Sequence, residues 1–267
     1  MSRIKVRRYQ IAMRGDMPRP TRPLRIVMIG DLHNRIFGEA NNELVTAIGK
    51  QVPDLVLSVG DLTVGKPGKE TNLDVGLSLL KRLSCECPVY CIHGNHEFRT
   101  KCYPQTYPGV YLKLIRELHR AGIHLLEDEC AKVDLLGTRL AIHGFELPME
   151  YYRRFGTKPL TANVVREHLG EPVEGHYNIL LAHNPLFFDS YALWGADLTV
   201  SGHLHGGLVR LPFLGGVISP QIQLFPKYDC GLFQKYGHKL VVTAGLGSHS
   251  FALRLNNPAE ITVLELR

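Results

Sequence analysis

A largely apolar run, Leu24-Arg-Ile-Val-Met-Ile-Gly30, ends directly at the polar cluster Asp31-Leu-His33. Runs of the same kind cover residues 54–60, 88–92, 177–182 and 197–201, and polar clusters follow most of them. Each run is short and apolar, which is typical of a buried β-strand. Because the carboxyl ends of neighbouring strands meet at one edge of a sheet, we expect the clusters to form one site. The five clusters are Asp31-Leu-His33, Gly60-Asp61, Gly94-Asn95-His96-Glu97, His183-Asn184-Pro185 and Gly202-His203-Leu204-His205.

These clusters contain side chains that bind transition metals. Carboxylate oxygens, an amide oxygen and neutral imidazoles suit manganese, iron, zinc or cobalt, and they suit calcium poorly. Two such ions about 3.5–4 Å apart can share a carboxylate and clamp the entering and leaving oxygens at phosphorus. Asp61 is the natural bridge, since a neutral imidazole has one lone pair to give. The expected ligands are Asp31, His33, Asp61, Asn95, His183, His203 and His205.

Each cluster taken alone also has a structural explanation. Asp31 and Asp61 could cap helices that follow strands, because aspartate is favoured at N-caps. The Gly94-Asn95-His96 segment could be a polar turn, and the pair of His203 and His205 could be structural. The order of all five clusters favours a metal site over these explanations.

The order D-x-H, G-D, G-N-H-E, H and G-H-x-H resembles the calcineurin-like metallophosphoesterase superfamily. The C-terminal part resembles, more narrowly, a membrane- or cell-wall-associated branch of bacterial phosphohydrolases. The resemblance covers nearly the whole chain, and it implies an α/β fold, a four-layer α/β/β/α sandwich of two mixed sheets flanked by helices. The C-terminal segments that carry it are Gly206-Gly207, Tyr228-Asp-Cys-Gly231, Gly245-Leu-Gly247, Arg254 and Asn257-Pro-Ala-Glu260.

The resemblance also implies a role for each site residue. His96 would face the phosphate and give a hydrogen bond or a proton to the leaving oxygen, while Glu97 would support the turn. Asn34, Arg35 and Arg254 are candidate substrate contacts, with solvent exposure as the alternative. The first metal would be held by Asp31, His33, Asp61 and His205, and the second by Asp61, Asn95, His183 and His203.

The implied activity is hydrolysis of a phosphodiester or pyrophosphate bond by a metal-bound hydroxide, on a lipid- or nucleotide-linked substrate. A phosphomonoesterase of the same fold is the alternative within enzymes, and a non-catalytic metal-binding scaffold is the alternative outside them. A protein phosphoserine phosphatase is disfavoured, because Gly60-Asp-Leu-Thr-Val-Gly65 lacks the arginine of that family's G-D-x-V-D-R-G motif.

Three further features give secondary expectations. His143 follows the apolar residues 139–142 and is expected at the same sheet edge, with Glu146 either behind the site or in a solvated loop. His93 is expected to be packed in the core. The six cysteines lack the paired C-x₂-C spacing of structural zinc sites, so free thiols are expected.

The first 25 residues contain eight basic residues, in a chain of net charge +6. We expect residues 1–22 to form a basic N-terminal segment, with residues 6–12 as a strand at a sheet edge. Its charge would suit an anionic membrane surface, and nucleic acid is not favoured because aromatic and basic residues do not interleave. The basic residues are Arg3, Lys5, Arg7, Arg8, Arg14, Arg19, Arg22 and Arg25.

A single domain spanning residues 1–267 fits the length and the 45% hydrophobic content. No apolar stretch approaches the ~18 residues of a transmembrane helix. We therefore expect a cytoplasmic protein or one peripheral at the membrane. In the resembling branch an anchor commonly precedes such a basic segment, and here it is either naturally lacking or has been removed. The sequence does not indicate an oligomeric state.

The remaining pattern predicts alternating helices and strands. Helices are expected at residues 41–51, 72–83 and 110–121, with a helical stretch within 153–169. Strands are expected at 124–126, 131–136 and 139–142, and strands at 239–243 and 260–266 should close the second sheet. The apolar loop 205–231 is expected to be a lid or a binding edge.

Overall fold

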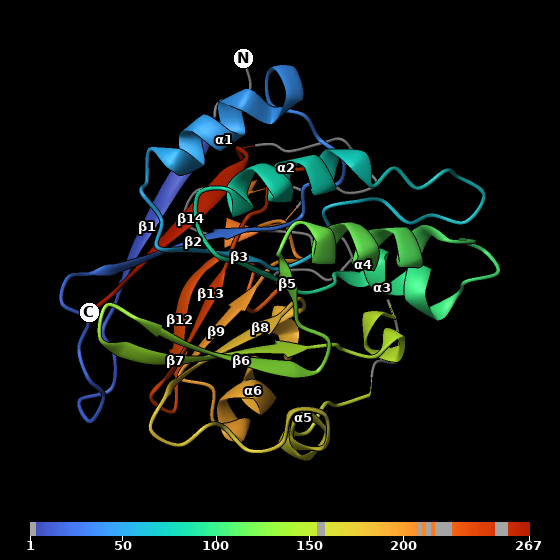
Figure 1. Cartoon of the computed structure of the whole chain (residues 1–267). Helices are drawn as coiled ribbons and strands as arrows, with labels where there is room; N and C mark the ends of the chain where they lie inside the picture. The colour runs from blue at the N-terminus through green and yellow to red at the C-terminus, as the bar shows by residue number, and fades with distance from the viewer. Residues whose placement is uncertain (1–3, 154–157, 208–209, 212–214, 217–225, 249–255) are drawn as a thin grey trace.

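The computed structural model describes residues 4–153, 158–207, 210–211, 215–216, 226–248 and 256–267. Two six-stranded sheets pack face to face, and helices cover the outer side of each (Figure 1). This is the four-layer sandwich expected from the sequence.

The first sheet contains strands from both ends of the chain. Its outermost strand is β1, which confirms the edge strand expected near residues 6–12. The prediction that residues 260–266 close the second sheet is wrong, because β14 lies in the first sheet, parallel to β1 and antiparallel to β2. Apolar alternation identifies a strand but not its neighbours. The order is β1 (Lys5–Ile11), β14 (Glu260–Leu266), β2 (Leu24–Ile29), β3 (Leu55–Ser58), β4 (Val89–Cys91) and β5 (His124–Leu125).

The second sheet has a parallel centre and an antiparallel hairpin at each side. β13, β9, β8 and β7 run parallel, and β12 and β6 pair antiparallel with the outer two. The strand expected at 239–243 does lie in this sheet. The order is β12 (Gly231–Lys235), β13 (His238–Val242), β9 (Leu198–Ser201), β8 (Tyr177–Ala182), β7 (Thr138–Phe145) and β6 (Glu129–Leu135), and the short strands β10 (Arg210–Leu211) and β11 (Gly215–Gly216) pair separately.

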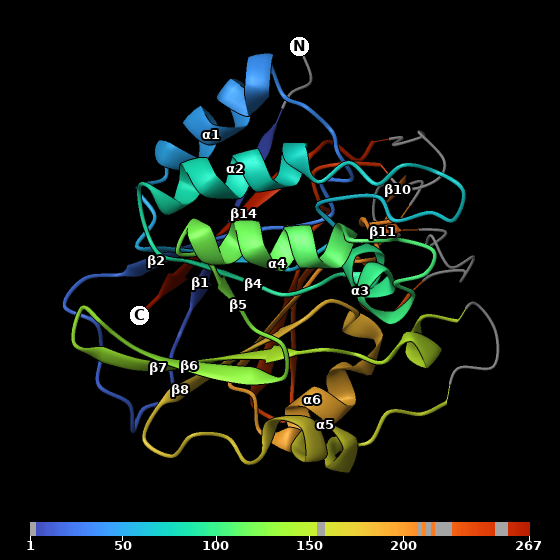
Figure 2. The ribbon, with the colours of Figure 1, turned by 45° about the vertical axis from the view of Figure 1, so that its right-hand side comes forward.

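Helices α1, α2 and α4 cover the first sheet, and α5 and α6 cover the second (Figure 2). In α2, Leu77, Leu80 and Leu83 recur at helical spacing and are buried. The prediction missed α3 and α6, which have only eight and seven residues. The helices are α1 (Asn42–Gly49), α2 (Asp74–Ser84), α3 (Asn95–Cys102), α4 (Val110–Arg120), α5 (Ala162–Leu169) and α6 (Phe188–Trp194), with short 3₁₀ turns η1 (Glu39–Asn41), η2 (Met149–Tyr152) and η3 (Pro185–Phe187).

The N-terminal segment is built into the core rather than appended to it. Ile11, Met13 and Met17 are buried in the apolar cluster between the two sheets. Several of its basic side chains are also engaged in ion pairs. These pairs are Arg7 with Glu260, Arg14 with Asp197 and Arg22 with Asp54, and Arg25, just after the segment, pairs with Glu265. Less of the segment's charge is therefore available to an external partner than the sequence suggests.

None of the helices in the described part of the chain combines the length and the apolar character that crossing a membrane requires.

Candidate metal centre

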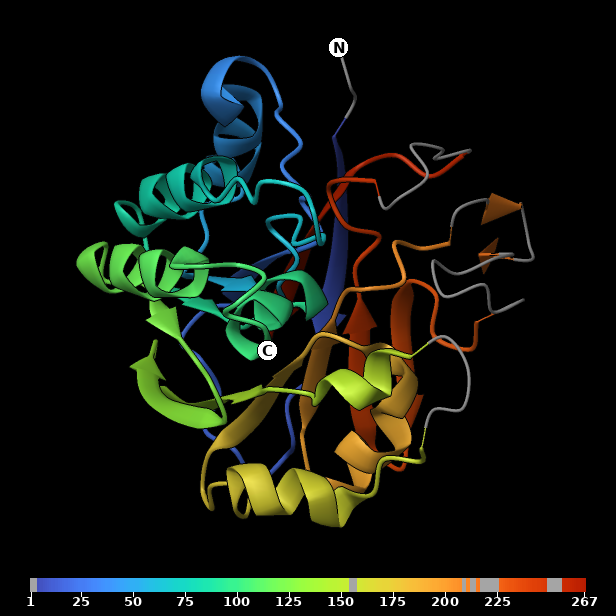
Figure 3. The ribbon, with the colours of Figure 1, turned by 90° about the vertical axis from the view of Figure 1, so that its right-hand side faces the viewer.

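The polar clusters meet where parallel strands of both sheets end. Asp31 follows β2, Asp61 follows β3 and Asn95 begins α3 just after β4. On the second sheet, His183 follows β8 and His203 follows β9. Figure 3 shows the molecule with this edge toward the viewer, and α3 and η2 lie near the centre of the view. The expectation of a single shared edge therefore holds across two packed sheets.

The backbone at these residues is unusual. Asp31, His33, Asp61, His203 and His205 all have positive φ, between 49° and 69°. Residues other than glycine rarely adopt this left-handed conformation, which costs about 1–3 kcal/mol each and is concentrated at functional sites. The surrounding structure must hold these turns in place, and sequence patterns contain no signal for them.

The first group of side chains consists of Asp31, His33 and His205. The Nε2 atoms of His33 and His205 lie 3.1 Å apart, and their rings are stacked with centroids 4.9 Å apart. His205 Nε2 lies 3.7 Å from Asp31 Oδ1. Two imidazole nitrogens and a carboxylate oxygen that converge on one point form a donor set for a single cation.

The second group consists of Asp61, His183 and His203. His183 donates from Nδ1 to the Val59 carbonyl at 2.6 Å, which leaves Nε2 directed at Asp61 Oδ2, 3.2 Å away. Asp61 Oδ2 is also 3.8 Å from His33 Nε2, so Asp61 neighbours the first group, and its carboxylate clusters with the rings of His33 and His96 as well. Next to them, the buried Oδ1 of Asn95 accepts no hydrogen bond from the described residues.

Charge in the cluster is balanced by the histidines. Burial by itself raises the pKa of the Asp61 carboxyl, but His183, His96 and His33 outweigh this effect and hold that pKa well below its usual value. Burial lowers the pKa of His183, but Asp61 and Asp31 more than compensate and raise it to about 9. Asp61 is therefore ionised, as a metal ligand must be.

His96 and Glu97 occupy the first turn of α3. The His96 ring lies edge-on to that of His33, with centroids 5.1 Å apart, and its Nδ1 donates to the Gly65 carbonyl at 3.1 Å. Glu97 accepts hydrogen bonds from the backbone nitrogens of Asp61, Gly94 and Thr63, each at 2.9 Å. Glu97 thus supports the turn, as expected from the sequence.

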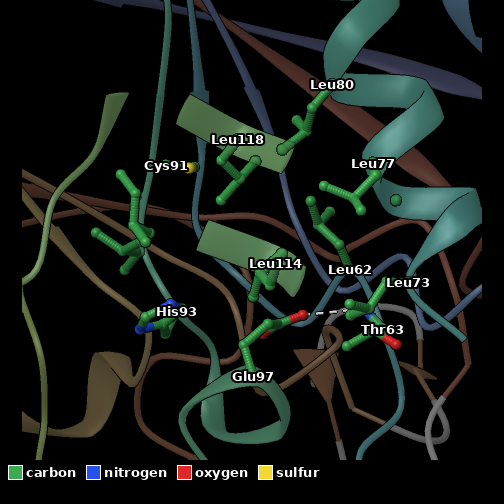
Figure 4. Close-up of a pocket in the computed structure, with 13 residues that line it drawn as sticks. Leu62, Thr63, Leu73, Leu77, Leu80, Cys91, His93, Glu97, Leu114 and Leu118 are labelled. Carbon is green, nitrogen blue, oxygen red and sulfur yellow. Dashed lines mark hydrogen bonds between the residues drawn. The ribbon is translucent and has the colours of Figure 1, made fainter. Parts of the chain in front are cut away.

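A cavity lies next to Glu97, between the first sheet and helices α2 and α4 (Figure 4). Its volume of about 30 Å³ is large enough for water but too small for a phosphate ester. Leucines form most of its wall, including Leu62, Leu77 and Leu114. It is a gap in the core and not the substrate site.

The candidate substrate contacts differ in what the structure shows. Asn34 has a left-handed backbone conformation, with φ of 61°, and its backbone nitrogen donates to the Leu62 carbonyl. Arg35 donates to the Leu246 carbonyl at 3.1 Å, and its guanidinium lies over the Phe37 ring, so the protein itself engages it. Arg254 lies outside the described residues, as does much of the expected lid between 205 and 231.

One secondary prediction is wrong, and one of the two alternatives given for Glu146 is excluded. His143 does not lie at the site edge, because β7 continues past it and its Nε2 bonds Asn178 Oδ1 at 2.9 Å inside the sheet. Glu146 is not in a solvated loop, because it accepts hydrogen bonds from His93 Nδ1 at 2.9 Å and Lys101 Nζ at 2.6 Å. His93 is buried, as expected.

Sequence reasoning missed three residues at the site. Tyr152, in η2, lies edge-on to the His203 ring with centroids 5.3 Å apart. Asn257 donates from Nδ2 to the carbonyls of His205 and Gly207, and so ties the C-terminal part of the chain to the G-H-x-H turn. Arg99 donates to the Gly65 carbonyl at 2.8 Å. Only Asn257 had a sequence signal, as part of the C-terminal resemblance.

The site agrees with the comparisons to known proteins. The family model of calcineurin-like phosphoesterases matches residues 24–207. The metallophosphoesterase YkuE of Bacillus subtilis is 26% identical over 91% of this chain and 79% of its own length. The phosphodiesterase YaeI of Escherichia coli is 26% identical over 91% of this chain and 82% of its own length.

A solved structure supports the fold. The phosphopantetheinyl hydrolase PptH of Mycobacterium tuberculosis has a TM-score of 0.51 and 15% identity, over 82% of this chain and 88% of that protein. The chain therefore belongs to the calcineurin-like phosphoesterases, hydrolases of phosphate esters.

Proposed function

We propose that this chain is a two-metal phosphohydrolase that cleaves a phosphodiester or pyrophosphate bond. One observation carries the proposal: Asp61 lies between two groups of ligand atoms, 3.2 Å from His183 Nε2 on one side and 3.8 Å from His33 Nε2 on the other. A carboxylate shared by two donor sets is the arrangement that a pair of divalent cations requires.

The residues present fit such a pair. The nitrogen and oxygen donors are those preferred by manganese, iron, zinc and cobalt. The unsatisfied Oδ1 of Asn95 also becomes explicable, since a buried amide oxygen without a donor is costly unless something binds it. One cation would be held by Asp31, His33, Asp61 and His205, and the other by Asp61, Asn95, His183 and His203.

When bound, the two cations would supply Lewis acidity and neutralise charge on the phosphoryl oxygens. The protein's own contribution would be to orient the substrate and move a proton. Because His96 Nδ1 donates to the Gly65 carbonyl, Nε2 is the nitrogen left to act on the leaving oxygen, and it would give that oxygen the second proton of a doubly protonated (imidazolium) ring. Such a group typically gives about 10²–10⁴ in rate.

The substrate class rests on the Gly60 to Gly65 segment and on the relatives. The segment lacks the arginine of protein phosphoserine phosphatases. YaeI is named a phosphodiesterase, which supports a diester-type bond. The pyrophosphate alternative and the lipid- or nucleotide-linked substrate are parts of the proposal that rest on the resemblance of the sequence alone.

A panel of matched diesters and monoesters, assayed on the metal-loaded protein, tests the substrate class. We expect turnover of the diester bis(p-nitrophenyl) phosphate to exceed that of p-nitrophenyl phosphate. Faster hydrolysis of the monoester would make the protein a phosphomonoesterase. Full metal loading without hydrolysis of any ester would make it a binding scaffold.

An anionic membrane surface is part of the proposal for where the substrate resides. The exposed Lys5 and Arg19 would contribute, each by about 1 kcal/mol near an anionic leaflet. We expect the protein to co-sediment with anionic vesicles at low salt. The Lys5→Glu/Arg19→Glu variant should lose this binding. Equal recovery with anionic and neutral vesicles would contradict it. Deleting residues 2–22 is unsuitable as a test, because it removes β1 and core methionines.

A further inference from the structure

One backbone carbonyl receives two side chains from α3. Gly65 O accepts a hydrogen bond from His96 Nδ1 at 3.1 Å and another from Arg99 NH1 at 2.8 Å. His96 and Arg99 are three residues apart in α3, so they lie on the same face of the helix. The two donors therefore converge on a single oxygen from one side.

The segment that contains Gly65 is tied to α3 further upstream by Glu97, which accepts hydrogen bonds from the backbone nitrogens of Asp61 and Thr63. It runs between β3 and α2 without regular structure, and it contains Lys66-Pro-Gly-Lys69. Contact at Gly65 is nevertheless close, because a Cβ atom added there would lie 2.6 Å from the His96 carbonyl oxygen. A loop carbonyl so near to His96 needs a fixed position if it is to orient the imidazole.

We propose that Arg99 is a positioning residue for His96: it fixes the Gly65 carbonyl as the acceptor that orients the imidazole. A charged donor makes a stronger hydrogen bond than a neutral one, so Arg99 makes the stronger of the two hydrogen bonds to this oxygen. Gly65 O in turn keeps one proton of His96 on Nδ1, so Nε2 faces His33 and the cluster and is the nitrogen that gives up the second proton of the imidazolium ring. The inference rests on the leaving-group role proposed for His96.

The tautomer of His96 gives a readout that does not need turnover. In metal-free protein, ¹⁵N spectra of the histidines, recorded under conditions in which the His96 ring is neutral, should show its one proton on Nδ1 in the wild type, with His96→Ala used to assign the signal. Arg99→Met should shift this signal toward a mixture of the two tautomers. Arg99→Lys, which keeps a charged donor, should restore most of the wild-type spectrum.

A double-mutant cycle on the metal-loaded enzyme tests the functional link. Arg99→Met should lower kcat about 10-fold for an alkyl ester with a poor leaving group, with KM and metal content within about twofold, since a small misplacement of a catalytic group is costly. A p-nitrophenyl ester should be nearly unaffected, because its leaving group needs little protonation. In the His96→Ala background, Arg99→Met should have no further effect.

Arg82→Met is the matched control, because Arg82 also donates to a backbone carbonyl outside its own helix, that of Ala40 in η1, at 2.7 Å. It should leave kcat and the His96 signal unchanged. An unchanged His96 tautomer in Arg99→Met, or a loss of kcat that persists in the His96→Ala background, would overturn the positioning role. Wild-type kcat in His96→Ala alone would instead refute the leaving-group role on which the inference rests.

Discussion

Removing the Glu97 carboxylate should destabilise the protein strongly. Glu97 is buried, and its two oxygens accept hydrogen bonds from the backbone nitrogens of Asp61, Gly94 and Thr63. In Glu97→Ala all three donors lose their acceptor. Each buried N–H left unsatisfied costs about 1–3 kcal/mol. The simple sum is an upper bound, because water can enter the space that the side chain leaves.

We therefore expect Glu97→Ala to lower the free energy of unfolding by about 3–5 kcal/mol, in the range of the largest single-residue effects. Glu97→Gln should lower the free energy of unfolding by about half as much. The one side-chain oxygen of glutamine can still accept hydrogen bonds from the Asp61 and Gly94 nitrogens, but its NH₂ group then faces the backbone N–H of Thr63, which is also a donor. Urea unfolding with linear extrapolation gives both values. The exposed Glu129 provides the control, and Glu129→Ala should change the stability by less than about 0.5 kcal/mol. A Glu97→Ala variant as stable as the wild type would refute the reasoning.

Two further predictions concern charge. The pKa of His183 in the metal-free protein is raised to about 9, above its ordinary value of 6.5, so the stability from its protonation is full below pH 6.5 and is lost as the pH rises through 9. Urea unfolding of metal-free protein should show this fall in the free energy of unfolding. A free energy of unfolding that stays constant from pH 6.5 to 9 would contradict the prediction. Lys101→Met should lower the free energy of unfolding by about 1–3 kcal/mol, because it removes the ammonium group that contacts the carboxylates of both Glu127 and Glu146 and leaves them only the His93 ring in common. Wild-type stability of the Lys101→Met variant at low salt would contradict this prediction, because it would mean that water already screens the charges of Lys101, Glu127 and Glu146.

The sequence was sufficient to predict the sandwich and the convergence of its polar clusters. Apolar runs that end in aspartate or histidine identify strands and the edge where they finish, and the structure brings Asp31, Asp61 and His183 together at such an edge. The placement of β14 could not be predicted, because strand pairing between the two ends of a chain depends on the complete fold.

The finer features of the site also depend on tertiary contacts. The Gly94-Asn95-His96 segment is typical of a turn, yet it begins a helix because Glu97 caps it from within. Tyr152 and Arg99 belong to no motif, and they reach the site only through the folding of the segments that carry them. The left-handed backbone at His203 is imposed by its surroundings.

The metal content of wild-type protein and Asp61→Asn tests the central claim most directly. The amide that replaces the carboxylate cannot supply a charged oxygen to two cations. Elemental analysis after reconstitution should find two metal ions per chain in the wild type and at most one in Asp61→Asn, with hydrolysis lost. Two metal ions retained in Asp61→Asn with normal turnover would contradict the bridging role of Asp61.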